Sequence, residues 1–487
     1  MMILMILQLL IVLLALYVGS RYGSLALGAI SGIGLAILVF GFGMKPGNPP
    51  TDVIYIIIAA VTCAGMMQAS GGMDWLIQLA ERLLRKHPDH ITFLAPLCTF
   101  FLTVLVGTGH VVYTLMPIIC DIALKKGIRP ERPCGVASIA SQVGITCSPI
   151  AAAVASFVVI SNAYHFDVNN LQVIGITIPA CLCGLMAAAA LSYKRGLDLE
   201  KDPKFQERLK DPKMYEYMYG SSVSVLDKKV DKGAKLAVYI FLGALGIIVL
   251  FSVMQIVGYD IRPRYNTLQL VKGVEDTAKF DIGGAMLTAK QILNAKLEIA
   301  GCTEYVQKPL AMNLIIQIVM IAAAAFMIIF AKASPKKAVS GAVWQSGMVA
   351  VVAIYGIAWL ADTYFAGYMA EMQDALKGIV TEYPWAIAFA FFAVSVLINS
   401  QGAVVVAMLP LAYSLGISGV VLLGVLPSVY GYFFIPNYPS DIATVNFDRS
   451  GTTVIGKYLL NHSFMMPGLV SVIVSTLVGL VLTNIFY

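Results

Sequence analysis

The sequence predicts an all-α polytopic membrane protein with about ten transmembrane helices and two re-entrant hairpins, arranged as two inverted repeats. Three observations lead to this fold class. Hydrophobic residues make up 59% of the 487 residues and charged residues 12%. Polar, helix-breaking clusters interrupt apolar segments twice in the same order. Loops rich in Lys and Arg alternate with loops that carry few, which indicates alternating membrane sides.

The apolar segments, taken in order, define the expected membrane crossings. These cover about 3–20, 23–43, 52–70, 134–161, 171–193, 236–257, 310–331, 338–361, 418–447 and 460–486. The segments 134–161 and 418–447 carry proline and polar residues at their middle, which predicts helices broken within the membrane. The first segment lacks a basic stretch before it and a small-residue cleavage pattern, so we interpret it as a retained span.

Two further apolar segments, 91–124 and 384–415, have flanks that do not suit a crossing. Basic residues flank 91–124 on both sides, so the positive-inside rule places both of its ends in the cytoplasm. The flanks of 384–415 are not basic, which places both of its ends outside. Each segment contains a polar cluster where it would turn, Gly107–His110 in the first and Asn399–Gly402 in the second. The sequence therefore predicts two re-entrant hairpins that enter from opposite sides.

The order span, span, surface helix, hairpin, broken span, span occurs twice, with opposite orientation. Any one cluster could be an ordinary kink, because glycine and proline are frequent in transmembrane helices. Four clusters in matching order favour a duplication. Both termini would then be periplasmic. The predicted division is an extra N-terminal span at 1–22, a first repeat at 23–193, a cytoplasmic linker with the span 236–257 and an outward polar insert within 194–309, and a second repeat at 310–487.

Polar clusters at membrane depth predict a substrate site there. The hairpins and broken spans contain no Lys or Arg, so backbone N–H groups, hydroxyls and amides would have to bind an anion. Half-helices that begin after Gly109, Pro149, Gly402 and Pro439 can supply the N–H groups. The alternative is that the hydroxyls satisfy carbonyls freed at kinks. The candidate substrate-binding residues are Gly107, Thr108, Gly109, His110, Thr146, Ser148, Asn399, Ser400, Gln401, Gly402, Asn437 and Ser440.

Two ionisable residues in these segments have more than one interpretation. His110 is the only histidine predicted at membrane depth, and it is either a hydrogen-bonded structural residue or a positive charge for a carboxylate. Asp441 could carry a proton, coordinate a coupling cation, help a partner to sense the transporter, or cap the half-helix that begins after Pro439.

Other functional classes find little support in the sequence. It contains no H-E-x-x-H, G-x-S-x-G or P-loop motif and no Cys/His metal spacing, so we expect no enzyme, no cofactor and no metal site. A sodium or proton antiporter would need paired intramembrane carboxylates, whereas Asp441 alone is clearly deep. A signalling subunit could dock a partner through 194–235, but its mixed charges predict a solvated helical linker. The net charge of +6 reflects basic loops, and no nucleic-acid partner is expected.

Four long stretches carry a family resemblance: Gln68–Trp75, Gly107–Ile119, Gly127–Pro133 and Phe433–Thr453. Over nearly the whole chain the sequence resembles the anaerobic C4-dicarboxylate transporter (Dcu) family of bacterial inner membranes. The resemblance implies exchange of fumarate, malate or aspartate for succinate during anaerobic respiration. It also implies membership of the ion-transporter superfamily, in which a hairpin-bearing domain moves against a scaffold. The insert at 258–309 is longer than expected for the family and has no assigned role.

Exchange also fits the charge of the substrate. Moving one charge across 100 mV costs ~2.3 kcal/mol, and swapping one dianion for another cancels this cost. The alternative is a proton- or sodium-coupled dicarboxylate symporter. The sequence leaves open the preferred substrate, its direction of transport, a homo-oligomer through the scaffold, and a cytoplasmic or membrane sensor partner.

Overall fold

The computed structural model describes residues 2–487 except 23–24, 221–222, 272–273, 283–284, 369–370, 372–381, 437 and 457–459. The helices up to residue 192 are α1 (Met2–Tyr22), α2 (Ala26–Ala36), η1 (Ile37–Gly41), α3 (Thr51–Ala69), α4 (Gly72–Lys86), η2 (Pro88–His90), α5 (Ile91–Val106), η3 (Gly109–Val111), α6 (Val112–Lys125), α7 (Glu131–Val143), η4 (Gly144–Cys147), α8 (Ala152–Ala163) and α9 (Asn170–Ser192). The later helices are η5 (Leu199–Lys201), α10 (Pro203–Leu209), α11 (Pro212–Tyr219), α12 (Lys232–Ile256), α13 (Ala289–Asn294), α14 (Met312–Ala331), α15 (Pro335–Ser340), α16 (Ala342–Gly367), η6 (Pro384–Ala386), α18 (Ile387–Leu397), α19 (Gln401–Ser414), α20 (Gly419–Val425), η7 (Leu426–Val429), α21 (Pro439–Phe447) and α22 (Met465–Phe486).

The helical membrane class predicted from composition is confirmed. Among the described residues, eight helical stretches are long and apolar enough to cross a membrane: Thr51–Ala69, Pro88–Val106, Glu131–Ala163, Asn170–Ser192, Lys232–Ile256, Met312–Ala331, Ala342–Gly367 and Met465–Phe486. Shorter apolar helices occupy Ile3–Gly19, Ala26–Gly41, Pro384–Leu397, Gln401–Ser414 and Gly419–Val429. The count of ten crossings stays a prediction, because three of the expected spans correspond to shorter helices.

Both spans that were expected to be broken are interrupted. In the first, the helix stops at η4 and resumes as α8 after an extended residue, Ala151. In the second, η7 ends at Val429, and α21 begins ten residues later at Pro439. Proline lacks the N–H that a continuous helix needs and clashes with the preceding turn, so it favours these breaks.

The two expected hairpins are present as helical pairs. Helices α5 and α6 pack against each other, and so do α18 and α19. At the open end of the first hairpin, the Asp89 carboxylate lies 2.9 Å from Lys126 Nζ, which brings the two chain ends together. That these pairs are re-entrant, and the membrane side from which each enters, stays a prediction, since Pro88–Val106 by itself is long and apolar enough to cross.

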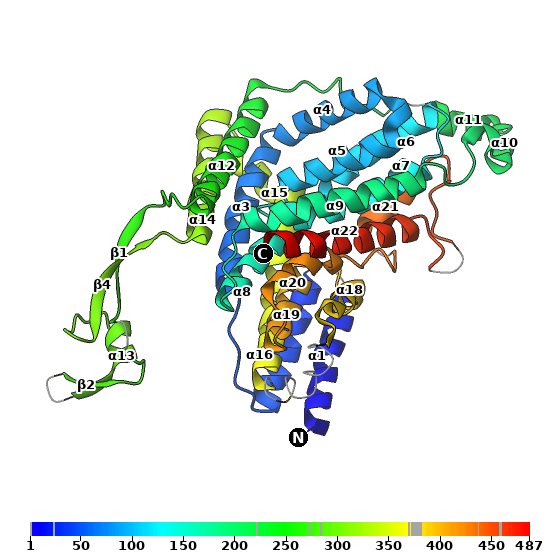
Figure 1. Ribbon diagram of the computed structural model, residues 1–487. Coiled ribbons are helices and arrows are strands. Elements are labelled where there is room, and N and C mark those ends of the chain that lie inside the picture. The colour runs from blue at the N-terminus through cyan, green and yellow to red at the C-terminus, as the bar shows by residue number, and fades with distance from the viewer. Residues whose placement is uncertain are drawn as a thin grey trace.

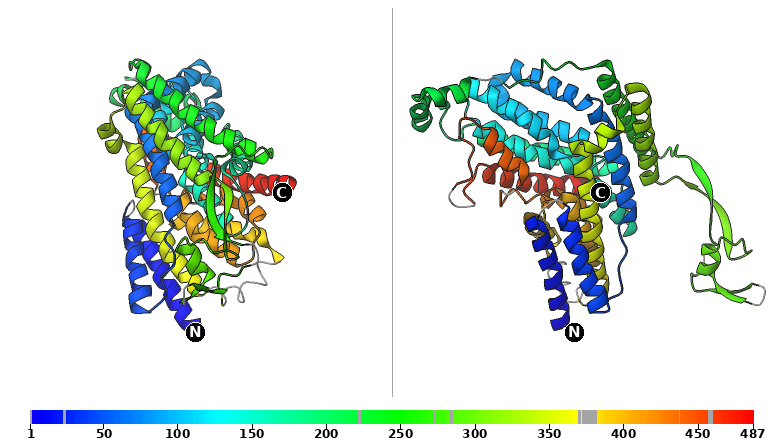
Figure 2. Two further views of the ribbon diagram at one scale, coloured as in Figure 1. Left: turned by 90° about the vertical axis from the view of Figure 1, so that its left-hand side faces the viewer. Right: turned by 180° about the vertical axis from the view of Figure 1, so that it is seen from behind.

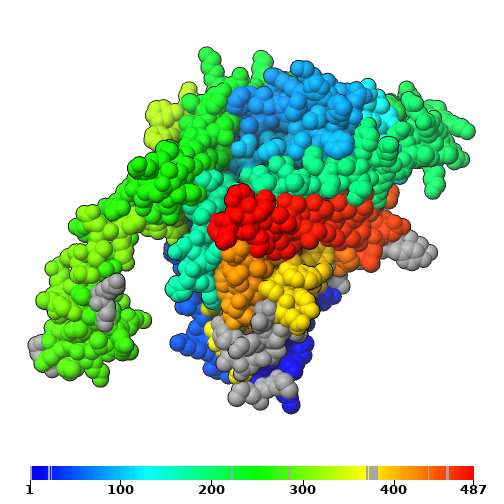
Figure 3. Space-filling view, in the orientation of Figure 1, coloured from blue at the N-terminus to red at the C-terminus, as the bar shows by residue number. Residues whose placement is uncertain are grey.

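The long helices form two groups that cross at a steep angle. Figure 1 shows α5, α7, α9 and α22 lying side by side, while α1, α16 and α19 run in another direction below them. Helices α9 and α22 pack along each other, and α22 covers part of the surface between α9 and α20 in the space-filling view (Figure 3). Helix α3 packs against α14 and α16, and α2 packs against α16.

The insert at 258–309 contains strands, which the all-α prediction did not anticipate. Strand β1 (Arg264–Leu270) pairs antiparallel with β4 (Thr303–Pro309), and β2 (Lys279–Ile282) pairs antiparallel with β3 (Ala285–Thr288). Strand β2 does alternate, since Phe280 and Ile282 are more buried than Lys279 and Asp281, but four residues are too few for this pattern alone to predict a strand. The insert extends from α12 and α14 as an arm, away from the helical body (Figures 1 and 2).

The linker at 194–235 is not merely a solvated helix. Its short helices η5, α10 and α11 bury Leu199, Phe205 and Met218 against Leu124 near the end of α6. The linker is therefore packed onto the same end of the first hairpin that carries its basic flank.

Candidate functional site

The tip of the first hairpin is closed on itself and packed against α7. Gly107 follows α5 with φ of +78°, a left-handed conformation that favours glycine. Thr108 Oγ1 accepts a hydrogen bond from the His110 backbone N–H at 3.2 Å and lies 2.9 Å from His110 Nδ1. A Cβ on Gly109 would come within 2.4 Å of Gln142 Nε2, so only glycine lets this tip approach α7 so closely.

Gln142, in the last turn of α7, connects elements from both halves of the chain. It is 2% exposed. Its Oε1 accepts a hydrogen bond from the Tyr432 hydroxyl at 2.9 Å, and its backbone oxygen accepts one from Gln401 Nε2 at 2.9 Å. Its Nε2 donates to Ser141 Oγ at 3.0 Å. One buried residue thus contacts the first tip, the second tip and the second helix break.

The tip of the second hairpin lies against the first half of the chain. Ser400 Oγ accepts a hydrogen bond from the Ala403 N–H at 3.3 Å and caps α19. A Cβ on Gly402 would lie 3.1 Å from Ala152 Cβ and 3.4 Å from the Ala153 nitrogen. The first turn of α19 therefore lies on the first turn of α8.

Tyrosines fill the second helix break. The ring centroids of Tyr430 and Tyr432 are 4.8 Å apart, and those of Tyr432 and Tyr438 are 4.7 Å apart. Tyr430 and Tyr432 are each 1% exposed. The Tyr430 hydroxyl has no hydrogen-bond partner among the described residues, whereas the Tyr432 hydroxyl bonds to Gln142.

The first turn of α21 places Ser440 and Asp441 next to this aromatic cluster, and both are buried. Asp441 accepts a short hydrogen bond, 2.6 Å, from Ser138 Oγ of α7. Within the described part of the chain, Ser440 Oγ has no hydrogen-bond partner. Asn437, another predicted binding residue, lies outside the described residues.

Four helix N-termini meet near the end of α7. Helices α6 and α21 pack together, and α8 and α19 pack together. Thr108 caps η3, the short turn that precedes α6, and Ser400 caps α19, whereas α8 and α21 begin without a side-chain cap. Uncapped N-terminal N–H groups carry partial positive charge and can donate to an anion. The observed starts of α19, at Gln401, and of α8, at Ala152, each differ by two residues from the predicted ones.

Two predicted binding residues, Thr146 and Ser148, form hydrogen bonds with the backbone at the first helix break. Thr146 Oγ1 donates to the Val143 carbonyl oxygen at 3.0 Å, which fits the structural interpretation of a hydroxyl at a kink. Ser148 Oγ accepts a hydrogen bond from the Ile150 N–H, with 3.4 Å between the oxygen and the nitrogen. Asn399, half-buried, adjoins Ser400 at the second tip.

Charged residues gather at the far end of the first hairpin. The buried Asp121 carboxylate of α6 lies 2.8 Å from Arg449 Nη2, 3.1 Å from Lys125 Nζ and 3.8 Å from Arg85 Nη2. Asp448 is also buried, and its oxygens accept hydrogen bonds from residues 450, 452 and 453. These ion pairs join α4, α6 and the residues that follow α21.

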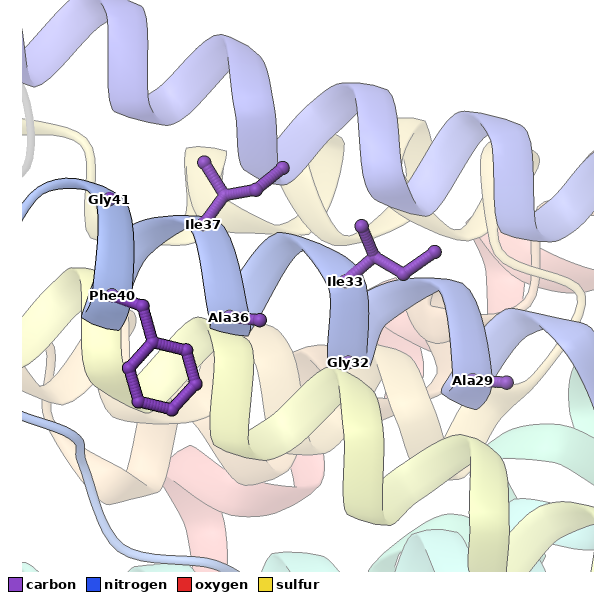
Figure 4. Close-up of a pocket in the computed structure, with 7 residues that line it drawn as sticks. All are labelled: Ala29, Gly32, Ile33, Ala36, Ile37, Phe40 and Gly41. Carbon is purple, nitrogen blue, oxygen red and sulfur yellow. The ribbon is translucent and has the colours of Figure 1, made fainter.

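A separate groove runs along α2 and η1 on the outside of the molecule (Figure 4). It has a volume of 680 Å³ and is lined by Ala29, Gly32, Ile33, Ala36, Ile37, Phe40 and Gly41. None of these side chains is polar, so the groove offers no directional partner for a charged ligand. We therefore place the candidate site at the Gln142 junction.

Sequence analysis overlooked several residues of this junction, namely Ser138, Gln142, Tyr430 and Tyr432. A signal was present: Ser138, Ser141 and Gln142 recur at helical spacing within an otherwise apolar span, which marks a polar helix face. Tyr430 and Tyr432 lie in an apolar stretch of the second broken span, where aromatic residues usually serve packing alone. Only the hydrogen bond from Tyr432 to Gln142 shows that they belong to the junction.

A family model described as "Anaerobic c4-dicarboxylate membrane transporter" matches residues 4–487. Relatives with a name are also called C4-dicarboxylate transporters. The anaerobic C4-dicarboxylate transporter DcuB of Escherichia coli O6:H1 is 42% identical over 475 residues, 97% of each chain. The C4-dicarboxylate transporter DcuA of Wolinella succinogenes is 33% identical over 483 residues, 99% of each chain. DcuA of Helicobacter pylori is 32% identical over 481 residues, 97% of each chain.

Proposed function

We propose, from the premise that this chain belongs to the family of anaerobic C4-dicarboxylate membrane transporters, that it exchanges C4-dicarboxylates such as fumarate, malate, aspartate and succinate across the bacterial inner membrane. The protein is a multi-pass membrane transporter and not an enzyme. The observation that carries the proposal is the Gln142 junction, where both hairpin tips and both helix breaks meet at buried, uncharged polar groups.

The junction offers donors to a dianion without a fixed cation. The uncapped starts of α8 and α21 present backbone N–H groups, and Ser440 adds a hydroxyl that has no partner among the described residues. Two pairs of half-helices, α6 with α21 and α8 with α19, suit the two carboxylates of a C4 diacid. The tip residues from Gly107 to His110 and from Asn399 to Gly402 complete the proposed site.

The absence of Lys and Arg from the hairpins and broken spans favours exchange. A dianion that enters an inside-negative cell at 100 mV costs roughly 4.6 kcal/mol, twice the cost of one charge. When a second dianion leaves on the same carrier, the two costs cancel, and no countercharge in the site is needed.

Matched packing pairs support an inverted duplication. Helix α2 packs on α16 as α14 packs on α3, and α19 packs on α8 as α6 packs on α21. Helix α1 packs on α2 as α12 packs on α14, so we extend each proposed repeat by one helix, α1 in the first and α12 in the second. Alternating access would move α5–α9 and α18–α22 against a scaffold of the remaining long helices, an elevator-like motion, with both termini periplasmic.

One observation favours the alternative, a proton- or sodium-coupled symporter. Asp441 is buried in the first turn of α21, and Ser138 is its hydrogen-bond donor among the described residues. A buried carboxyl in such surroundings is costly when charged, so binding a proton or cation could compensate its charge.

Uptake of labelled succinate into proteoliposomes distinguishes the two. An exchanger takes up label rapidly when the vesicles contain unlabelled fumarate and slowly when they are empty. Empty vesicles are the matched control, tested with and without an inward sodium or proton gradient. Gradient-driven uptake that does not depend on internal dicarboxylate would overturn exchange in favour of the symporter.

A further inference from the structure

Besides Ser440 Oγ, two buried polar atoms at the Gln142 junction have no hydrogen-bond partner among the described residues, and each can accept a hydrogen bond. They are the side-chain carbonyl oxygen Oε1 of Gln401, a residue that is 2% exposed, and the hydroxyl of Tyr430, which is 1% exposed. Burial of a polar group without a partner is unfavourable, so such atoms in a native protein call for an explanation. A ligand that supplies the missing partner is one.

The orientation of the Gln401 amide is determined by its contact with α7. Its nitrogen lies 2.9 Å from the backbone oxygen of Gln142, and a carbonyl oxygen can only accept. The nitrogen must therefore face Gln142, and the free end of the amide is the carbonyl oxygen. This leaves a fixed acceptor at the tip of the second hairpin.

Tyr430 belongs to the same junction. Its ring centroid is 4.8 Å from that of Tyr432, and the Tyr432 hydroxyl is bonded to the side chain of Gln142. Gln401 is bonded to Gln142 directly, and Tyr430 adjoins it through Tyr432, so the two groups come to the junction from the second hairpin and the second break. A phenol can both donate and accept, whereas the amide oxygen can only accept.

A fixed acceptor is a poor partner for a carboxylate, because it places a partial negative charge against a full one. It suits a donor, such as a hydroxyl or an ammonium group. We propose that Gln401 Oε1 and the Tyr430 hydroxyl form a subsite for the 2-substituent of a C4-dicarboxylate, the hydroxyl of malate or the ammonium of aspartate. This inference rests on the proposed function, since it assumes that the junction holds the dicarboxylate.

The subsite separates substrates that the carboxylate donors treat alike. Succinate and fumarate have no hydrogen-bond donor between their carboxylates and leave both acceptors unpaired. Malate pairs with them through a neutral hydroxyl, and aspartate through a charged ammonium, which makes the stronger hydrogen bond. The subsite should therefore contribute more to the preference for aspartate over succinate than to the preference for malate over succinate.

The test is competition in succinate-loaded proteoliposomes. Uptake of labelled succinate is inhibited by graded malate or aspartate, and each inhibition constant is divided by that for unlabelled succinate. Gln401→Leu removes the acceptor, and Tyr430→Phe removes the hydroxyl with little change of shape. Gln345→Leu, at an exposed position on α16, is the matched control. In Gln401→Leu we expect the preference for aspartate over succinate to fall by about tenfold and that for malate by about threefold.

Tyr430→Phe separates the loss of the subsite from a general loss of protein stability. Because the hydroxyl lacks a partner among the described residues, its removal should not lower the thermal midpoint of the substrate-free protein. A lower aspartate and malate preference in this stable variant supports the subsite even if Gln401→Leu does not fold. Equal weakening of all substrates, or unchanged ratios, in a variant that still exchanges succinate overturns the subsite alone. Wild-type protein that exchanges no dicarboxylate overturns the proposed function and the subsite with it.

Discussion

The two hairpins share a shape but are anchored by different forces. The first is tied at its far end by the buried Asp121, which pairs with Arg449 beyond α21 and with Lys125 of its own helix. The second, residues 384–415, contains no Asp, Glu, Lys or Arg. Its tip reaches α7 through the hydrogen bond from Gln401 to Gln142.

This difference in anchoring predicts that the two hairpins move differently during transport. Separating the first hairpin from α4 and α21 would expose charges that now satisfy one another, which is expensive. Moving the second hairpin would break far fewer polar contacts and mainly slide apolar surfaces. We therefore expect the first hairpin to move with α21 as a rigid unit and the second to open as a gate.

The largest effect should come from Asp121→Asn. The carboxylate is fully buried, and its loss removes the ion pair with Arg449, a side chain that is 14% exposed. Lys125 and Arg85 are more exposed and can turn to water, so we expect destabilisation at the low end for a broken buried pair, about 3 kcal/mol. Thermal unfolding of the purified protein, followed by size-exclusion chromatography, measures the change.

Asp89→Asn is the matched control, because Asp89 forms an exposed ion pair with Lys126 at the same hairpin. It should leave the unfolding midpoint unchanged. An equal loss of stability in the two variants would show that the Asp121 cluster does not anchor the hairpin more than a surface pair does.

Gln142→Ala should have the second-largest effect, and it bears on both hairpins. It leaves the buried Tyr432 hydroxyl without its acceptor and opens space beneath Gly109, which we expect to cost about 2 kcal/mol. Tyr432→Phe removes the same hydrogen bond from the other side. The double variant should be less destabilised than the sum of the single ones, and strict additivity would contradict a direct coupling.

How much the sequence could predict depended on whether a feature was local. Glycine and proline indicated where the helical pairs turn and where the spans break, because these residues act on their own stretch of backbone, whereas the membrane sides inferred from the charge flanks stay a prediction. The pairing of Gln142 with Gln401 and Tyr432 joins positions that are 259 and 290 residues apart, and no local pattern encodes it. The sequence allows two interpretations of Thr146, and its local hydrogen bond to Val143 favours the hydroxyl at a kink, while its role in binding stays a prediction.

The caps of the two tips provide a smaller and symmetrical test. Thr108→Ala and Ser400→Ala each remove an N-cap hydrogen bond, worth about 1 kcal/mol. If the second hairpin is the gate, Ser400→Ala should speed amide hydrogen exchange around residues 398–403 much more than Thr108→Ala speeds it around 107–112. Equal acceleration at both tips would remove the distinction between a rigid and an opening hairpin.

The smallest effect is expected from His110→Gln, and it is best seen in its pH dependence. The His110 ring lies beside Thr108 Oγ1 at the first tip, half-buried and 5.7 Å from the Tyr113 ring. If a protonated imidazole attracts a substrate carboxylate, substrate affinity is highest below the pKa of His110 and weakens as pH rises through it, because the positive charge is lost. An unperturbed histidine has a pKa of ~6.5, so the comparison covers about pH 5.5 to 8.

In His110→Gln, the glutamine keeps a hydrogen-bonding group next to Thr108 but cannot gain the charge. The substrate affinity of this variant should therefore change by less than about tenfold and lose its pH dependence. His165→Gln, in the loop between α8 and α9, controls for other histidines. A pH profile that His110→Gln leaves intact would mean that the first tip binds through its backbone, and its contribution would then resemble that of the second.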